Sequence, residues 1–202
     1  MQFVGAIHES PVNFPKKGMN RMRKWMHILT VVFVLLTVAF YMIYSYNESV
    51  VIYSVFVTFL TFSYHFIMRL IVGFLTRFIP EKTMNPENKW FSPKKFEKKI
   101  YKLLKVKKWK GNIPAYYPEA FDVEKHSLSE IAVTMCGAEV THEIIVLFSF
   151  VPILFSLKFG VPVVFIITSV LAAAVDSVFI IVQRYNRPRI IRLMKSNSAK
   201  TK

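Results

Sequence analysis

The sequence predicts an all-α polytopic membrane protein: a four-transmembrane-helix bundle with an amphipathic interfacial helix between the second and third spans. Hydrophobic residues make up 53% of the 202 residues and 19 residues are Phe, which is too apolar for an ordinary soluble domain. Four apolar runs are each long enough to cross a bilayer core, which takes about 20 helical residues. Basic residues gather beside alternate ends of these runs, as the positive-inside rule requires.

The apolar runs define one membrane domain, residues 25–183. The predicted spans are about 25–46, 50–79, 138–157 and 161–182. The first run follows 24 residues and has no small-residue cleavage pattern after it, so we expect it to stay as an anchor rather than to be cleaved as a signal peptide. A basic segment, 1–24, precedes the domain, and a basic tail, 184–202, follows it.

The formal charge of +15 alternates along the chain with the predicted topology. Five Lys and Arg precede the first span, Lys16 and Lys17 among them. The stretch from Lys82 to Lys110 contains 11 lysines with both ends included, and seven basic residues follow the fourth span. The link 47–49 has no positive charge. This bias predicts a multi-pass protein of the cell membrane with both termini in the cytoplasm. Because the lysines flank apolar spans, we expect membrane lipids as partners and no nucleic acid.

The surface segment 80–137 is predicted to lie on the membrane. Ser92 is a good N-cap, and Pro93 suits the first helical position. One face of the helix that follows is apolar, against lysines on the other, which is typical of an interfacial helix. This apolar face consists of Phe96, Ile100, Leu103 and Leu104.

A turn-rich connector ends that helix at Gly111, Pro114 and Pro118. Its aromatic residues, Tyr116, Tyr117 and Phe121, are typical of headgroup depth. Ser127 and Glu130 then have the spacing of a capping box, which predicts a new helix leading to the third span, with a break expected at Gly137.

Ionisable residues inside predicted spans each cost about 2.5 to 3.5 kcal/mol on insertion scales, so each needs a partner or a function. The six are His65, Arg69, Glu139, His142, Glu143 and Asp176. Residues three or four apart share a helix face, which groups the first two together and the next three together. We expect a polar cluster facing the inside of the bundle in the cytoplasmic leaflet.

Two interpretations of this cluster are open. Arg69 paired with Glu143 or Asp176 would simply hold the helices together. The trio Glu139, His142 and Glu143 favours a catalytic role, because an imidazole beside a carboxylate is the usual arrangement of a general base.

The pattern favours no bound metal. Glu139-x-x-His142 is half of a di-iron carboxylate motif, but no second copy lies on another helix, and Val146 stands where a zinc protease would need its second His. The single Cys136 is better explained as a small buried residue than as an acyl-carrying nucleophile.

A polar motif, QRYNRPR, spans 183–189 at the end of the fourth run. It is either a stop-transfer cluster or a phosphate site, because arginines bind phosphate in a bidentate fashion and neither Tyr nor Asn is needed to retain a helix. The residues assigned to this substrate site are Arg184, Tyr185, Asn186, Arg187 and Arg189.

Three stretches of the chain resemble a known family. They are VKKWK at 106–110, AEVTH at 138–142 and IIVQRYNRPR at 180–189. In order and spacing, over roughly residues 75–195, the chain resembles the glycosyl-4,4'-diaponeurosporenoate acyltransferases, small membrane enzymes of staphyloxanthin-type carotenoid synthesis. The resemblance implies transfer of a fatty acyl group to a sugar hydroxyl of a membrane glycolipid in a bacterial cell membrane.

We therefore expect a membrane acyltransferase in which His142, oriented by Glu139 or Glu143, deprotonates the sugar hydroxyl. The donor would be acyl-CoA or a similar cytosolic thioester, and no bound cofactor is expected. Further substrate-binding residues are assigned as Trp109, Lys110, His65, Arg69 and Asp176. Arg69 would also steady the oxyanion.

The alternative is a non-catalytic membrane protein that binds a lipid or a partner protein. A transporter is disfavoured, because four spans without an internal repeat offer little for alternating access. The acceptor, the donor and the oligomeric state stay open at this point.

Overall fold

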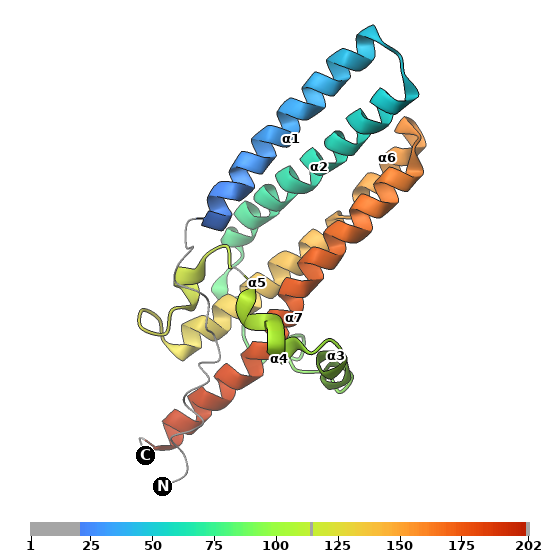
Figure 1. The fold of residues 1–202 in the computed structure, drawn as a ribbon. Helices are drawn as coiled ribbons and strands as arrows, with labels where there is room; N and C mark the ends of the chain where they lie inside the picture. The colour runs from blue at the N-terminus through green and yellow to red at the C-terminus, as the bar shows by residue number, and fades with distance from the viewer. Residues whose placement is uncertain (1–20, 114, 201–202) are drawn as a thin grey trace. The chain divides into compact units, whose positions relative to one another are not determined.

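The computed structural model describes residues 21–113 and 115–200, and within them the chain forms helices and turns without a strand (Figure 1). The predicted basic residues Lys16 and Lys17, the turn residue Pro114 and the last two residues of the tail lie outside the described part. Four helical stretches are long and apolar enough to span a membrane, as predicted. They are Met22–Tyr46, Val50–Phe78, Leu128–Phe159 and Pro162–Ala199.

The chain divides into two compact units. Of the described residues, the first unit contains 21–22, 80–113, 115–139 and 179–200, and the second contains 23–79 and 140–178. The helices α5 (Leu128–Phe148) and α7 (Pro162–Lys200) each contribute residues to both units.

In the second unit, α1 (Arg21–Tyr46) and α2 (Val50–Leu75) form an antiparallel hairpin. Its helices interlock through aromatic rings, since the ring of Phe33 lies 5.3 Å from that of Phe62 and 5.0 Å from that of Phe66. One polar contact also joins them, between the hydroxyls of Thr37 and Ser63 at 2.9 Å. Large apolar side chains on the outer face of α1 stay exposed, as expected of a helix that faces lipid.

The third predicted span differs from the expectation. α5 begins at Leu128, ten residues before the predicted start, and it runs through Gly137 without the expected break. The helix is interrupted instead at Ser149 and Phe150, and α6 (Val151–Phe159) follows with Pro152 in its first turn, where a proline costs no backbone hydrogen bond. The chain then turns at Gly160, where φ is 66°.

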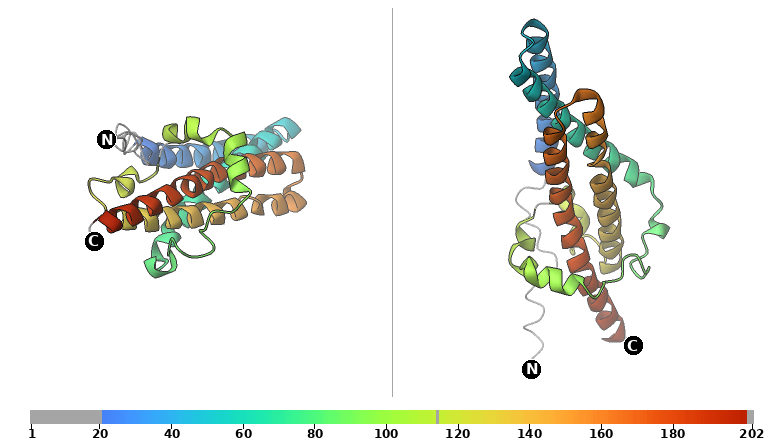
Figure 2. Two further views of the ribbon diagram at one scale, coloured as in Figure 1. Left: turned by 90° about the horizontal axis from the view of Figure 1, so that it is seen from below. Right: turned by 90° about the vertical axis from the view of Figure 1, so that its right-hand side faces the viewer.

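The surface segment also differs from the prediction. It forms two short helices, α3 (Glu97–Leu103) and α4 (Val106–Trp109), rather than one helix from Pro93 (Figure 2). Lys105, with φ 51°, adopts the left-handed conformation, which no α-helix continues through. The predicted apolar face is nevertheless exposed, with Phe96 at 61% and Leu103 at 80%, as an interfacial segment requires.

The capping box before α5 is confirmed. The backbone N–H of Ser127 donates to the Glu130 carboxylate at 2.8 Å, and the Glu130 N–H donates to the Ser127 hydroxyl at 3.3 Å. The helix that it starts packs against the C-terminal part of α7 through a small core, which includes Ile131, Met135 and Ile190. α7 itself continues helically past Pro188 to Lys200, so the predicted tail extends the fourth helix.

Candidate functional site

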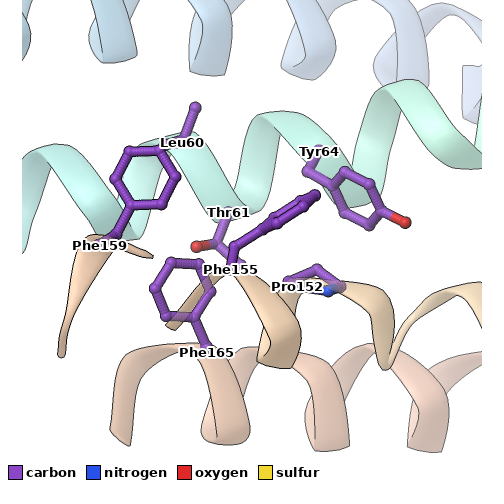
Figure 3. Close-up of a pocket in the computed structure, with 7 residues that line it drawn as sticks. All are labelled: Leu60, Thr61, Tyr64, Pro152, Phe155, Phe159 and Phe165. Carbon is purple, nitrogen blue, oxygen red and sulfur yellow. The ribbon is translucent and has the colours of Figure 1, made fainter. Parts of the chain in front are cut away.

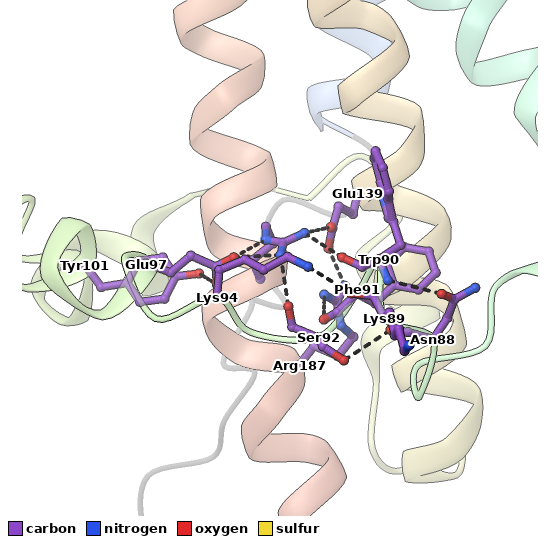
Figure 4. Close-up of polar contacts among 11 residues, drawn as sticks. Asn88, Lys89, Trp90, Phe91, Ser92, Lys94, Glu97, Tyr101, Glu139 and Arg187 are labelled. Atoms are coloured by element: carbon purple, nitrogen blue, oxygen red, sulfur yellow. Dashed lines mark hydrogen bonds and ion pairs between the residues drawn. The ribbon is translucent and has the colours of Figure 1, made fainter.

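A cluster of four charged residues holds the first unit together, and we call it the arginine cluster: Glu97, Glu139, Arg184 and Arg187 (Figure 4). Arg184 Nη1 lies 2.5 Å from Glu139 Oε1, and Arg184 Nη2 lies 2.6 Å from Glu97 Oε1. The other Glu139 oxygen accepts from Arg187. Two arginines thus balance two carboxylates, with Glu139 fully buried and Arg187 1% exposed.

The same arginines bind the backbone of the surface segment. Arg187 Nη2 donates to the carbonyl of Phe91 at 2.5 Å and its guanidinium lies over the Phe91 ring, while Arg184 reaches the carbonyls of Trp90 and Ser92. Ser92, the predicted N-cap, therefore serves as an acceptor for Arg184 in front of α3. These bonds fix residues 90–97 to α5 and α7.

Tyr101 completes the cluster on α3. Its hydroxyl donates to Glu97 Oε2 at 2.8 Å, and its ring meets the Tyr185 ring edge-on. Burial, followed by the hydrogen bond to Glu97, raises the pKa of Tyr101 well above its ordinary value. The phenol therefore stays neutral and acts as a donor.

The rest of the QRYNRPR motif gathers around one aromatic ring. Lys110 Nζ lies 5.3 Å from the centre of the Tyr185 ring, and the guanidinium of Arg189 lies 4.7 Å from it. Lys110 also donates to Asn186 Oδ1 at 2.9 Å. The neighbouring Trp109 donates to the carbonyl of Leu104 at 2.8 Å. This group stays partly exposed at Lys110, Tyr185 and Arg189.

A second polar cluster lies in the second unit, and we call it the triad: Arg69, His142 and Asp176. Arg69 donates to Asp176 Oδ2 from Nε at 3.0 Å and from Nη2 at 2.5 Å. The other Asp176 oxygen lies 2.9 Å from His142 Nδ1. Asp176 is buried, while the imidazole side chain of His142 is 23% exposed.

The triad has the geometry of an oriented base. Two N–H groups of Arg69 converge on Asp176 Oδ2, and the other oxygen of this carboxylate accepts from His142 Nδ1, which therefore carries the proton in the neutral ring. The other ring nitrogen, Nε2, is then the basic nitrogen of the imidazole, and a nitrogen of this kind can accept a proton. Arg69 also donates to the carbonyl of His65 on α2 and to that of Ala172 on α7, so the guanidinium is held by both helices.

The structure redistributes the predicted site residues between these two clusters. The predicted pairing of Arg69 with Asp176 is present. The carboxylate in contact with the His142 imidazole is Asp176, and Glu139 contacts arginines in the other unit. Glu143 is half-buried on α5.

The arginines predicted to bind phosphate, Arg184 and Arg187, bind carboxylates and backbone carbonyls inside the protein. The Arg187 side chain is 1% exposed, whereas that of Arg184 is 14% exposed. The sequence interpretation did not identify Glu97 as a site residue. A single acidic residue in a lysine-rich helix was the pattern that could have indicated it.

Cys136 is buried, as the sequence favoured. Within the described part of the chain, no group of three His, Cys, Asp or Glu side chains is placed to hold a metal ion.

An apolar pocket of about 290 Å³ lies in the second unit (Figure 3). α2 contributes Leu60, Thr61 and Tyr64, α6 contributes Pro152, Phe155 and Phe159, and α7 contributes Phe165. Because the Thr61 hydroxyl bonds to its own helix at Val57, the lining presents mainly carbon to the space. Such a lining suits a hydrocarbon chain.

A family model described as Glycosyl-4,4'-diaponeurosporenoate acyltransferase matches residues 87–196, which is more than half of the chain. The matched region includes every residue of the arginine cluster, and His142 and Asp176 of the triad. No curated protein and no solved structure matches the chain.

Proposed function

The chain belongs to the glycosyl-4,4'-diaponeurosporenoate acyltransferase family and is an acyltransferase, and we propose that it acylates a sugar hydroxyl of a glycosyl carotenoid in the membrane. The donor in this proposal is a cytosolic acyl thioester such as acyl-CoA. The observation that carries it is the 2.9 Å contact between His142 Nδ1 and Asp176 Oδ1.

The reaction follows from the triad geometry. His142 Nε2 takes the proton of the sugar hydroxyl as its oxygen forms a bond to the thioester carbonyl carbon. The C–S bond of the tetrahedral intermediate then breaks, and the imidazolium returns the proton to the thiolate that leaves. Asp176 stabilises the imidazolium between these steps, and Arg69 holds the Asp176 carboxylate in place through two hydrogen bonds to Oδ2.

Glu139 takes a different role from the one first assigned to it. Fully buried and bound to two arginines, it acts in this proposal as a positioning residue that anchors the surface segment to α5 and α7. The partly exposed cations beside Tyr185, namely Lys110 and Arg189, are the groups that we assign to the phosphates of the donor.

The charge pattern supports a topology in which both termini face the cytoplasm, where the thioester is made. Lysine-rich residues 82–110 then lie on the same side. Their exposed apolar neighbours on α3 support contact with the membrane surface.

A substitution of the base tests the proposal. In membranes that contain the His142→Ala variant, transfer from a labelled acyl thioester to the glycosyl carotenoid should fall by at least about 100-fold, the usual contribution of a general base. His27→Ala, an exposed histidine on α1, is the matched control and should keep wild-type activity. Unchanged transfer by a normally inserted His142→Ala protein would refute the catalytic assignment. Mass spectrometry of membrane lipids would show which species gains an acyl chain.

A further inference from the structure

Two buried polar side chains in the second unit make no hydrogen bond within the described part of the chain. His65 on α2 is 2% exposed and Ser169 on α7 is fully buried. The two ring nitrogens of His65 have no hydrogen-bond partner in the part of the chain that the structure describes. The same is true of the Ser169 hydroxyl. Leaving such groups unpaired in an apolar interior costs free energy, so each calls for an explanation.

Contacts along α2 and α7 place these two residues at the same level. Thr61 on α2 and Phe165 on α7 line the apolar pocket together, whereas Arg69 binds the carbonyl of Ala172 and the carboxylate of Asp176 (Figure 3). The two helices therefore run in the same direction, in register. His65 lies midway between Thr61 and Arg69, and Ser169 lies between Phe165 and Ala172.

They also share a face with these contacts. Thr61, His65 and Arg69 are four residues apart on α2, and residues at that spacing lie one above the other on a helix. Phe165 and Ser169 are four apart on α7, and Asp176 follows after two further turns. His65 and Ser169 thus form one layer between the pocket and the triad, about 6 Å from the level of Arg69 along α2.

The hydrogen-bonding capacity of this layer selects its ligand. A neutral imidazole offers one donor and one acceptor, and a serine hydroxyl offers both. The carbonyl oxygen of a ketone or a thioester can only accept hydrogen bonds, so it pairs with the donors of the layer alone. A hydroxyl can both donate and accept, so it pairs with the donors and the acceptors. The hydrogen-bonding capacity of the layer therefore matches a hydroxyl-rich group such as a sugar, and the aromatic pocket that begins at Thr61 on the next turn of α2 matches an apolar tail.

We propose that His65 and Ser169 bind sugar hydroxyls of the acceptor that are not acylated, and thereby position the reacting hydroxyl at His142. This inference rests on the proposed function, because it assigns the sugar to the site of the triad. It makes the layer a specificity-determining element, since buried polar groups reject an analogue that cannot pair with them.

Acceptor kinetics provide the first test. His65→Leu should raise KM for the glycosyl carotenoid by about 10-fold, because one or two hydrogen bonds to the acceptor are lost. KM for the thioester should stay within twofold of the wild-type value. His65→Gln, which keeps one donor and one acceptor, should recover most of the acceptor affinity. Ser169→Ala, a smaller change, should raise the same KM in the same direction even if His65→Leu folds poorly. A change in thioester KM alone, or no change in acceptor KM, would overturn the inference.

Binding provides a readout that does not depend on acyl transfer. Wild-type protein in nanodiscs should retain the glycosyl carotenoid in preference to its aglycone, and His65→Leu should lose that preference. If the preference is present and lost in His65→Leu but no acyl transfer occurs, the sugar-binding role of the layer stands, and the proposed function fails together with the positioning role. If transfer occurs and His65→Leu leaves the preference unchanged, the layer is satisfied by water and the inference fails.

Discussion

The arginine cluster predicts an asymmetry among three variants. Glu139→Leu removes the carboxylate that forms an ion pair with Arg187 in the described part of the chain, and a buried guanidinium that loses its partner costs about 3 to 5 kcal/mol. Arg187→Leu should cost less, because Glu139 keeps its contact with Arg184 at 2.5 Å. In the double variant Glu139→Leu, Arg187→Leu, a neutral pair remains, Arg184 with Glu97 at 2.6 Å.

Thermal unfolding in detergent measures this asymmetry, with tryptophan fluorescence as the signal. A loss of about 3 to 5 kcal/mol corresponds to a fall in Tm of about 6 to 20 °C for a chain of this size. The double variant should recover at least half of the loss caused by Glu139→Leu alone. Glu87→Leu is the matched control, because its partner Lys195 is 3.8 Å away and both side chains are more than 70% exposed. An exposed pair of this kind contributes about 0 to 1 kcal/mol. A double variant as unstable as Glu139→Leu would refute the reasoning.

Three further predictions follow from other contacts. Asp176→Asn should lower kcat for acyl transfer by about 10²- to 10⁴-fold, because the amide no longer stabilises the His142 imidazolium, and steady-state kinetics on the correctly inserted variant would check this. Ser127→Ala should lower stability by about 1 kcal/mol through loss of its cap bond to Glu130, as measured by the same unfolding assay. The raised pKa of Tyr101 favours the neutral phenol in the folded protein, so the contribution of this phenol to stability should be complete below about pH 10 and be lost at higher pH. An absorbance titration should show a tyrosinate transition at high pH that is missing in Tyr101→Phe.

Much of the fold could be predicted from local patterns. Span number follows from uninterrupted apolar length, and the capping box follows from two residues three positions apart. The kink at Lys105 could not be predicted, because no glycine or proline marks that left-handed residue. The break after Phe148 was equally hidden, since Pro152 is compatible with the first turn of a new helix as well as with a helix interior that bends.

The site could be predicted in composition but not in pairing. All three members of the triad were recognised as ionisable residues inside spans. The carboxylate that contacts His142 is nevertheless 34 residues away in sequence, whereas Glu139 and Glu143 were the local choices. The contacts of Arg184 and Arg187 with Glu139 could not be predicted for the same reason, because this carboxylate lies 45 and 48 residues away in sequence, which no local pattern displays.

The chemistry of the two clusters separates structure from catalysis. In the arginine cluster, charges balance, both carboxylates are buried, and the guanidinium groups are bound to carboxylates and carbonyls, which is the arrangement that holds helices together at least cost. The triad is also balanced when His142 is neutral, but the imidazole side chain of His142 is 23% exposed, whereas Glu139 is fully buried and the Arg187 side chain is 1% exposed. A side chain that serves packing alone gains nothing from exposure. We therefore expect a substrate to add a contact at the triad that the protein does not already supply.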